Sequence, residues 1–309
     1  MFIMMCGISG SGKSTYARKE SDRLNSSSNE LNSVILSSDA IRKELYGDEC
    51  IQGDPKEVFA IMKKRTLEEI AKQHTVFYDA TNLSAKKRTA IVKEIKSKYS
   101  YILCQCVIMA VREEICIQRQ NMRNRVVTAE VIEEQFRHFQ VPYYNEGWDT
   151  ISVISEHDFD INDYLLKDCN VFQHNPHHLL TISNHCLVSS RIAEKLARRM
   201  GLDVNLLSTA AKYHDVGKLI TKTFFDSHGN YGKRAHYYNH SNVGAYLWLC
   251  SNESLNFDTN SSLMIAALIQ WHMQPYFVKD ISDWLEKRNF DTVFRDYLKL
   301  INEADAAAK

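Results

Sequence analysis

A glycine-rich stretch near the N-terminus has the residue types that bind phosphate groups. It reads G-I-S-G-S-G-K-S-T, matches the pattern G-x-x-x-x-G-K-[ST], and stands between an apolar run at 2–6 and a helical pattern at 13–24. Glycines let backbone N–H groups turn toward phosphate oxygens, and the helix N-terminus adds its positive dipole end. We expect Lys13 to reach the β- and γ-phosphates of ATP and Ser14 to hold Mg²⁺. The motif predicts triphosphate binding through Gly7, Ser9, Gly10, Ser11, Gly12, Lys13, Ser14 and Thr15.

A carboxylate and a guanidinium follow the next apolar run. Asp39 comes directly after the run at 34–38, and Arg42 lies about one helical turn later. A carboxylate at a strand end beside the phosphate loop could accept a hydroxyl proton while the γ-phosphate is transferred. Arg42 could bind a phosphate of the acceptor through two hydrogen bonds. The alternative is that Asp39 only caps the helix expected at 40–46.

Two further features accompany the phosphate loop. Asp79 ends the run at 75–79 and could orient Mg²⁺ or its waters. The alternative is that Asp79 belongs only to a turn that ends the strand. The stretch 112–125 carries four arginines, of which Arg119 and Arg123 are four apart and share a helix face. Such arginines could close over the triphosphate and stabilise the transferring phosphoryl group, or they could form an ordinary solvated surface.

Histidines are concentrated in the last part of the chain, where nine of the twelve lie at or after position 174. Imidazole and carboxylate ligands without thiolates suit a divalent metal with open positions, such as Mg, Mn, Fe, Ni or Co, better than structural zinc. A bound metal of this kind lowers the pKa of a water molecule and polarises a phosphoryl oxygen. The candidate ligands, each on or beside a helical pattern, are His185, His214, Asp215, His240, His272 and Asp305.

The elements that must position these residues differ between the two halves. Short apolar runs alternate with helical patterns over 1–154, which predicts an α/β domain with a parallel sheet and flanking helices. The segment 155–170 is acidic and mixed, and we expect it to be a linker. Helical periodicity dominates 171–309, which predicts an all-α domain. The expected strands are 2–6, 34–37, 75–79, 101–109 and 151–154.

The composition limits the classes of partner. The chain of 309 residues has 38 basic and 38 acidic residues, so nucleic-acid binding would have to rest on local clusters rather than on bulk charge. Its eight cysteines form no C-x-x-C pair, which favours reduced thiols. No apolar run approaches the ~18 residues of a membrane span, and we expect no signal peptide, because the stretch before the phosphate loop is too short for one. We expect a cytoplasmic protein with no membrane contact.

The first half resembles the 5′-OH polynucleotide kinases of phage and bacterial end-healing enzymes. The resemblance covers 1–154 and rests on the phosphate loop, S-S-D39-x-x-R42, D79-A-T-N82, R119-x-x-x-R123 and the segment 139–149. It implies that Asp39 is the general base, that Arg42 holds a phosphate of the acceptor, and that Arg123 acts in a lid with Arg119. The implied acceptor is the 5′-OH end of RNA or DNA. Kinases of small molecules share much of the pattern.

The second half resembles the HD phosphohydrolase superfamily. Tyr213-His-Asp-Val-Gly-Lys218 is similar to its signature run, with a histidine upstream and an aspartate near the chain end, and the resemblance covers 171–309. It implies that a first metal is bound by His185, His214, Asp215 and Asp305. His240 and His272 then match the positions that complete two-metal members, with Asp215 as the bridge. Lys218 would contact the substrate phosphate.

Together the two halves predict a bifunctional end-healing enzyme. A kinase would phosphorylate 5′-OH ends with ATP and Mg²⁺, and the HD domain would remove a 3′-phosphate or a 2′,3′-cyclic phosphate. A separate ligase could then use the ends, because it needs a 5′-phosphate and a 3′-OH. The alternatives are a small-molecule or nucleotide kinase fused to an HD nucleotidase, and a triphosphate-gated binding module with a sensor site.

Overall fold

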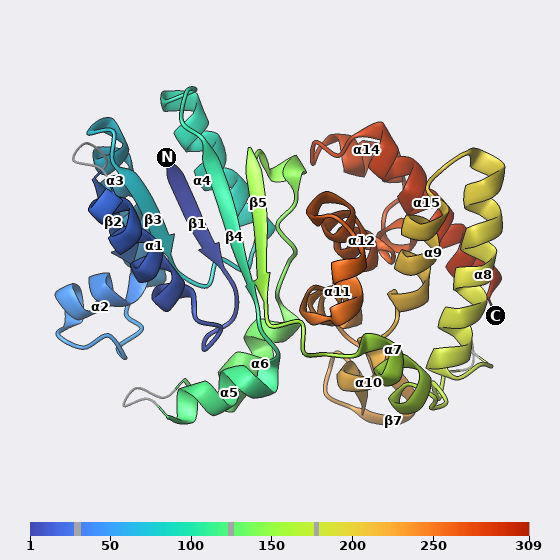
Figure 1. Ribbon diagram of the computed structural model, residues 1–309. Coiled ribbons are helices and arrows are strands. Elements are labelled where there is room, and N and C mark those ends of the chain that lie inside the picture. The colour runs from blue at the N-terminus through green and yellow to red at the C-terminus, as the bar shows by residue number, and fades with distance from the viewer. Residues whose placement is uncertain (28–31, 123–126, 176–178, 309) are drawn as a thin grey trace. The chain divides into compact units, whose positions relative to one another are not determined.

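The computed structural model describes residues 1–27, 32–122, 127–175 and 179–308 (Figure 1). The chain divides into two compact units. The first comprises Met1–Gln135 and Glu146–Ser155, and the second comprises Phe136–Asn145 and Glu156–Lys309. Among the described residues, no helix is both long and apolar enough to cross a membrane.

The first unit is built on a five-stranded parallel sheet with the strand order β2-β3-β1-β4-β5. Every residue of β1 and β3 is buried, as expected where helices cover both faces of a parallel sheet. The parallel sheet with flanking helices confirms the expected α/β architecture. The strands are β1 (Phe2–Cys6), β2 (Ser33–Ser37), β3 (Thr75–Asp79), β4 (Cys104–Ala110) and β5 (Thr150–Ser155). The helices are α1 (Lys13–Ser27), α2 (Ser38–Tyr46), α3 (Pro55–Ala71), α4 (Ala85–Lys98), α5 (Glu113–Asn121) and α6 (Ala129–Arg137).

A buried apolar cluster fastens α1 to this sheet. Ala17 of α1 packs with residues of β1, β3 and β4, and the half-buried Tyr16 and Leu24 extend the contact along the helix. Burying such side chains contributes about 25 cal/mol per Å² of apolar surface. The packing therefore holds the start of α1, and with it the phosphate loop, at the carboxyl end of β1. The cluster consists of Ile3, Met5, Ala17, Phe77, Val107 and Met109.

The second unit is helical. Its longer helices begin at side chains that accept hydrogen bonds from the first-turn N–H groups, as Thr181, Asp203, Asp258 and Asp291 do for α8, α9, α12 and α15. The helices are α7 (Ile161–Asp163), α8 (Ile182–Met200), α9 (Val204–Tyr213), α10 (Lys218–Thr221), α11 (His240–Cys250), α12 (Thr259–Trp271), α13 (Gln274–Phe277), α14 (Ile281–Glu286) and α15 (Thr292–Ala307). A π-helical turn (Tyr164–Asp168) and short 3-10 turns (Tyr144–Glu146, Asn252–Asn256) complete the description.

An antiparallel hairpin interrupts the helices between α10 and α11, and helical periodicity did not predict it. Its strands are β6 (Lys222–Phe225) and β7 (Tyr231–Tyr237). The connecting turn is closed by Asp226, whose Oδ1 accepts hydrogen bonds from the N–H groups of His228 and Asn230. The second unit is thus mainly, though not entirely, helical.

Two segments that we expected in the first domain and in the linker pack in the second unit. In the first, Phe136–Asn145, the ring centroids of Phe136 and Phe139 lie 5.2 and 4.7 Å from that of Tyr246. The N–H of Val141 donates to Gln270 Oε1 at 2.5 Å. In the segment 155–170, expected as a linker, Ile161, Leu165 and Cys169 are buried. These apolar side chains leave water only by joining the helical core, which explains why both segments belong to the second unit.

Candidate active sites

The phosphate loop leaves β1 at the centre of the sheet and enters α1. Gly10 and Gly12 have φ angles of +87° and +92°, a region that favours glycine. A Cβ on Gly10 would lie 2.4 Å from the carbonyl oxygen of Cys116, so the loop also depends on a close approach to α5. The sequence-predicted loop therefore has the strand–loop–helix setting that phosphate binding requires.

The two polar residues at the start of α1 lie against the end of β3. Lys13 is buried and donates from Nζ to the carbonyl oxygen of Ile8 at 2.8 Å, and Ser14 Oγ donates to Asp79 Oδ2 at 2.6 Å. Burial lowers the pKa of Lys13, and burial raises the pKa of Asp79 against the opposing hydrogen bond from Ser14 and the charge of Lys13. Neighbouring opposite charge opposes each shift without cancelling it, so the pair suits a site that receives anionic phosphates and a cation. Ser14 and Asp79 would hold the Mg²⁺ ion.

Asp39 and Arg42 form an ion pair beside the phosphate loop. Arg42 Nη1 donates to Asp39 Oδ1 at 2.8 Å; the carboxylate side chain is 46% exposed and the arginine side chain only 11%. The charge of Asp39 opposes the lowering of the Lys13 pKa by burial and adds to the rise of the Asp79 pKa. The helix N-cap is Ser37, so Asp39 lies in the first turn of α2 and does not cap it. Arg42 Nε is buried without a hydrogen-bond partner among the described residues.

The arginines expected in a lid are only partly described. Arg119 lies in α5 and is half-buried, whereas Arg123 and Arg125 fall outside the described residues. A residue that sequence reasoning missed approaches the loop instead: Gln135 Oε1 accepts a hydrogen bond from the N–H of Ser9 at 2.7 Å. That N–H is one of the groups that we expect a triphosphate to bind, so in this structure Gln135 takes the place of a phosphate oxygen.

A buried ion pair supports the strand ends behind the loop. Arg88 and Glu146 form two hydrogen bonds at 2.8 and 2.5 Å, with side chains 0% and 2% exposed. Arg88 also donates to the carbonyl oxygen of Asn82, whose Nδ2 donates to that of Met5. Removing one partner of such a pair leaves a buried charge and costs about 3–5 kcal/mol. Arg88 thus links Asn82 with Glu146, a contact that only the tertiary structure reveals.

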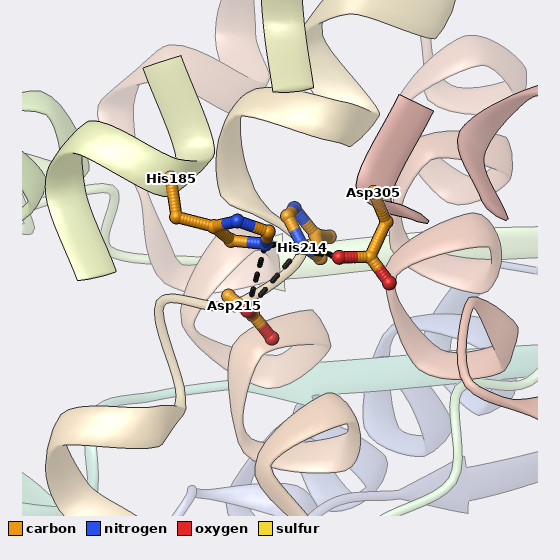
Figure 2. A group of neighbouring side chains, drawn as sticks. All are labelled: His185, His214, Asp215 and Asp305. Atoms are coloured by element: carbon orange, nitrogen blue, oxygen red, sulfur yellow. Dashed lines mark hydrogen bonds and ion pairs between the residues drawn. The ribbon is translucent and has the colours of Figure 1, made fainter. Parts of the chain in front are cut away.

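The predicted histidine and aspartate ligands converge inside the second unit. Figure 2 shows His185, His214, Asp215 and Asp305 pointing toward one another from α8, the end of α9 and α15. His185 Nε2 lies 2.9 Å from Asp305 Oδ1, 3.2 Å from His214 Nε2 and 3.4 Å from Asp215 Oδ2. Three of these side chains are almost wholly buried and Asp305 is 11% exposed. Four ligand atoms from three separate segments thus surround one small volume.

Asp215 also faces a second group. Its Oδ1 lies 3.2 Å from His240 Nε2 and 3.7 Å from His272 Nε2, and those two nitrogens are 3.4 Å apart. His240 is the first residue of α11 and His272 follows α12 directly. In each of the two groups, the possible ligand atoms all lie within 4.8 Å of one another. Asp215 belongs to both groups, the position that a bridging carboxylate takes.

The other ring nitrogen of each histidine faces a backbone carbonyl oxygen. His185 Nδ1 is 3.0 Å from Ala308 O, and the same nitrogens of His214, His240 and His272 lie 2.7–2.8 Å from a carbonyl three residues earlier. A carbonyl oxygen only accepts hydrogen bonds, so each Nδ1 carries the proton and each Nε2 lone pair points into the cluster. Two Nε2 lone pairs at 3.2–3.4 Å repel each other unless a proton or a metal ion lies between them.

The titration behaviour of the buried cluster agrees with this requirement. Burial by itself disfavours the charged form of His214, but the charge of Asp215 and hydrogen bonds to Asp215 and Asp305 raise its pKa well above 6.5. Burial opposes the charge of Asp215 as well, yet Lys218 and His214 hold its pKa well below 3.8. Burial and the charges of His214 and His240 lower the pKa of His272 to about 3. The buried carboxylates therefore draw positive charge to His214, whereas His272 stays uncharged, with its Nε2 lone pair facing Asp215.

Three neighbours complete the surroundings. Lys218 Nζ lies 2.5 Å from Asp215 Oδ2 and donates to the buried Gln173 Oε1 at 2.9 Å, and Tyr276 Oη donates to Asp305 Oδ2 at 3.1 Å. Lys218 thus points into the cluster from the first turn of α10. Sequence reasoning singled out Lys218 but missed Gln173 and Tyr276, since neither belongs to the signature run.

The donor set fits divalent metal. Imidazole nitrogens and carboxylate oxygens without thiolates are borderline-to-hard ligands, and their number and shared carboxylate suit two ions. His185, His214, Asp215 and Asp305 would hold one ion, and Asp215, His240 and His272 the other. A metal so bound supplies an activated water and polarises a phosphoryl oxygen.

The comparisons with known proteins divide the chain in a similar way. The family described as AAA domain matches residues 2–142, and the family described as HD domain matches residues 182–308. Curated proteins yielded no match. Among solved structures, a gluconokinase from Sinorhizobium meliloti 1021 is 15% identical over 49% of this chain and 80% of its own, with a TM-score of 0.33. The tunicamycin resistance protein of Deinococcus radiodurans is 12% identical over 65% of this chain and 96% of its own, with the same TM-score of 0.33.

The two family matches agree with the parallel sheet and phosphate loop of the first unit and with the helices and histidine cluster of the second. This combination supports a kinase together with a phosphohydrolase. The chain thus joins a P-loop kinase-like α/β domain to a helical HD domain.

Proposed function

We propose that this protein is a nucleic-acid end-healing enzyme with two activities. Its first unit would transfer the γ-phosphate of ATP to the 5′-OH of an RNA or DNA end. Its second unit would hydrolyse the phosphate monoester, or the 2′,3′-cyclic phosphate, at a 3′ end. The product would carry the 5′-phosphate and 3′-OH that a ligase joins, so a separate ligase is the partner that we expect.

In the kinase step, Asp39 Oδ would accept the proton of the attacking 5′-OH as its oxygen bonds to the γ-phosphorus and the bond to the β-phosphate oxygen breaks. The exposure of Asp39 leaves room for a large acceptor to reach it. Arg42, already aligned by its ion pair with Asp39, would bind the acceptor phosphate, with its Nε, which has no hydrogen-bond partner among the described residues, as one donor. Lys13 would exchange the carbonyl of Ile8 for phosphate oxygens as charge develops between them.

In the hydrolytic step, the residues of the second unit hold the phosphate and set the charge around it. Lys218 would turn from Asp215 toward the substrate phosphate, because bound metal would replace it as the counter-charge of that carboxylate. The backbone contacts of the four histidines keep their Nε2 atoms aimed inward throughout. Tyr276, held at Asp305, lies where its hydroxyl could donate to the departing 3′ oxygen or to the phosphate.

The observation that carries the proposal is the juxtaposition of Asp215 with four inward-facing Nε2 atoms in a chain that also presents Asp39 and Arg42 beside a phosphate loop. A site that adds a phosphate at a 5′ end and a site that removes one at a 3′ end can act on the same broken strand. A strand broken to leave a 5′-OH and a 3′-phosphate has both.

The test is a single incubation analysed at both ends. A 5′-OH, 3′-phosphate oligonucleotide is mixed with the protein, γ-labelled ATP, Mg²⁺ and Mn²⁺, and the 5′ label and the released phosphate are measured separately. We expect both reactions on RNA, on DNA or on both. If label passes only to a mononucleoside or another small acceptor, and only free nucleotides lose phosphate, the protein is instead a small-molecule or nucleotide kinase joined to a nucleotidase.

A further inference from the structure

The β6–β7 hairpin carries aromatic and basic side chains that neither candidate site uses. It begins four residues after Lys218 and leads into His240, so both of its ends are attached to the metal-ligand cluster. Between the two ends, the side chains of Phe225, Tyr231 and Tyr238 are 52%, 73% and 42% exposed. Exposed aromatic side chains in such number on one short hairpin indicate a contact surface.

The two faces of the hairpin have different neighbours. Tyr237 points inward, since its Oη donates to the carbonyl oxygen of Gln173, and the adjacent inward residue Ala235 is buried. Side chains alternate along a strand, so Arg234 and His236 lie on the opposite, outward side, and the exposed Tyr238 lies in the turn that follows β7. The rings of His236 and Tyr238 are parallel within 3° and their centroids are 5.6 Å apart. These three residues are called the outer row below.

The outer row has the chemistry of a single-stranded nucleic-acid platform. Aromatic rings stack on bases of any sequence, and cationic side chains neutralise phosphates beside them. Arg234 and the neighbouring Lys233 are both exposed. Asp226 is the only acidic residue in 222–238, and it is engaged by the backbone of the turn. The hairpin is therefore locally basic, although the chain as a whole has no net charge.

We propose that the outer row binds the single strand whose 3′ end is presented to the metal-ligand cluster. The idea rests on the proposed function and adds a named binding surface to it. Tyr238 is two residues before His240, a separation that spans at most about 7 Å of chain. A base stacked on Tyr238 and His236 would therefore belong to a nucleotide close to the one whose phosphate is hydrolysed. Arg234 would bind a phosphate one step further along the strand.

Two substitutions test the platform in the full chain. Tyr238→Ala and His236→Ala are each made in an Arg42→Ala background, which weakens acceptor binding by the first unit. Tyr101→Ala is the matched control, because Tyr101 is a tyrosine of the first unit that is 68% exposed and contacts another ring. Anisotropy of a 5′-fluorescein-labelled, 3′-phosphorylated oligonucleotide is measured with chelator present, so that binding is read without hydrolysis. RNA and DNA forms are compared.

We expect each outer-row substitution to weaken oligonucleotide binding by roughly five- to a hundredfold, as loss of a base–aromatic stack does. The control substitution Tyr101→Ala should leave oligonucleotide binding unchanged. With metal restored, KM for the oligonucleotide 3′-phosphate should rise in proportion while kcat, and hydrolysis of a mononucleoside 3′-phosphate, stay unchanged. Arg234→Ala should reduce the slope of log affinity against log salt by about one.

Three results would overturn the platform. The first is equal oligonucleotide binding by the outer-row variants and the control. The second is a parallel loss of mononucleoside hydrolysis, which would assign these side chains to the structure of the metal-ligand cluster. The third is binding of double-stranded and single-stranded oligonucleotides with equal affinity. If the unsubstituted protein hydrolyses no 3′-phosphate but the outer-row variants still lose oligonucleotide binding, the proposed function fails and the platform stands.

Discussion

We expect Gly217→Ala to disrupt the metal-ligand group that contains His240 and to leave the other group intact. Gly217 lies between Asp215 and α10, where a Cβ would be 2.1 Å from the carbonyl oxygen of His240 and 2.7 Å from the N–H nitrogen of Gly244. Both contacts are with backbone, so no side-chain rotation relieves them. The start of α11 has to move away by about 1 Å before the shorter contact reaches 3.0 Å, and His240 moves with it.

The magnitude follows from this displacement. Overpacking of a well-packed site costs about 1–3 kcal/mol, which lowers Tm by about 2–4 °C per kcal/mol in a unit of this size. The contact of His240 Nε2 with Asp215 Oδ1, now 3.2 Å, is lost, whereas His185, His214 and Asp305 are held by other helices. Because a 1 Å misplacement costs about 10²-fold in rate, we expect 3′-phosphate hydrolysis to fall by about that factor.

The assay is metal stoichiometry by calorimetry with Mn²⁺, together with phosphate release and 5′ phosphorylation. We expect the variant to bind one Mn²⁺ fewer than the unsubstituted protein and to keep its kinase activity. Gly232→Ala is the matched control, because a Cβ at Gly232 meets nothing within 4 Å and should leave every measurement unchanged. Full metal binding with full hydrolysis by Gly217→Ala would refute the reasoning that close approach of α11 assembles the second group.

Four other outcomes are expected. Lys13→Ala should abolish phosphoryl transfer but not hydrolysis, and loss of both in a folded protein would contradict separate sites. Asp39→Asn should slow 5′ phosphorylation by roughly 10²–10⁴-fold with ATP binding largely kept, whereas an unchanged rate would remove Asp39 as the base. Arg42→Ala should raise KM for the oligonucleotide and not for ATP, as initial rates will show. Chelator should stop hydrolysis and Mn²⁺ should restore it better than Ca²⁺, and Asp215→Ala should prevent that restoration.

Local sequence was enough to predict the phosphate loop and the alternation of strands and helices around it. The loop is a contiguous run whose glycines and lysine act within a few residues of one another, and its strand–loop–helix setting can be read from the flanking apolar patterns. The metal-ligand set was also predicted as residues, because a histidine directly followed by an aspartate and a downstream glycine is a compact signal.

Features that depend on distant segments could not be predicted in the same way. The ion pair of Arg88 with Glu146 joins positions 58 apart, and nothing in the residues near either one indicates the other. The hairpin of β6 and β7 lies in a region of mixed aromatic and charged residues, where neither helical nor strand periodicity dominates. The packing of Phe136–Asn145 in the second unit likewise depends on Tyr246 and Gln270, more than a hundred residues away.

The sequence by itself therefore determined which chemical groups are present and which short runs hold them: a phosphate loop, an aspartate with an arginine one turn later, and six residues able to ligate metal. Only the tertiary structure decided their geometry. Four helices deliver the histidines, and carbonyl oxygens orient each ring so that Nε2 faces Asp215. The physical reason is that ligand direction depends on hydrogen bonds and close helix contacts, which form only when segments far apart in the chain pack against one another.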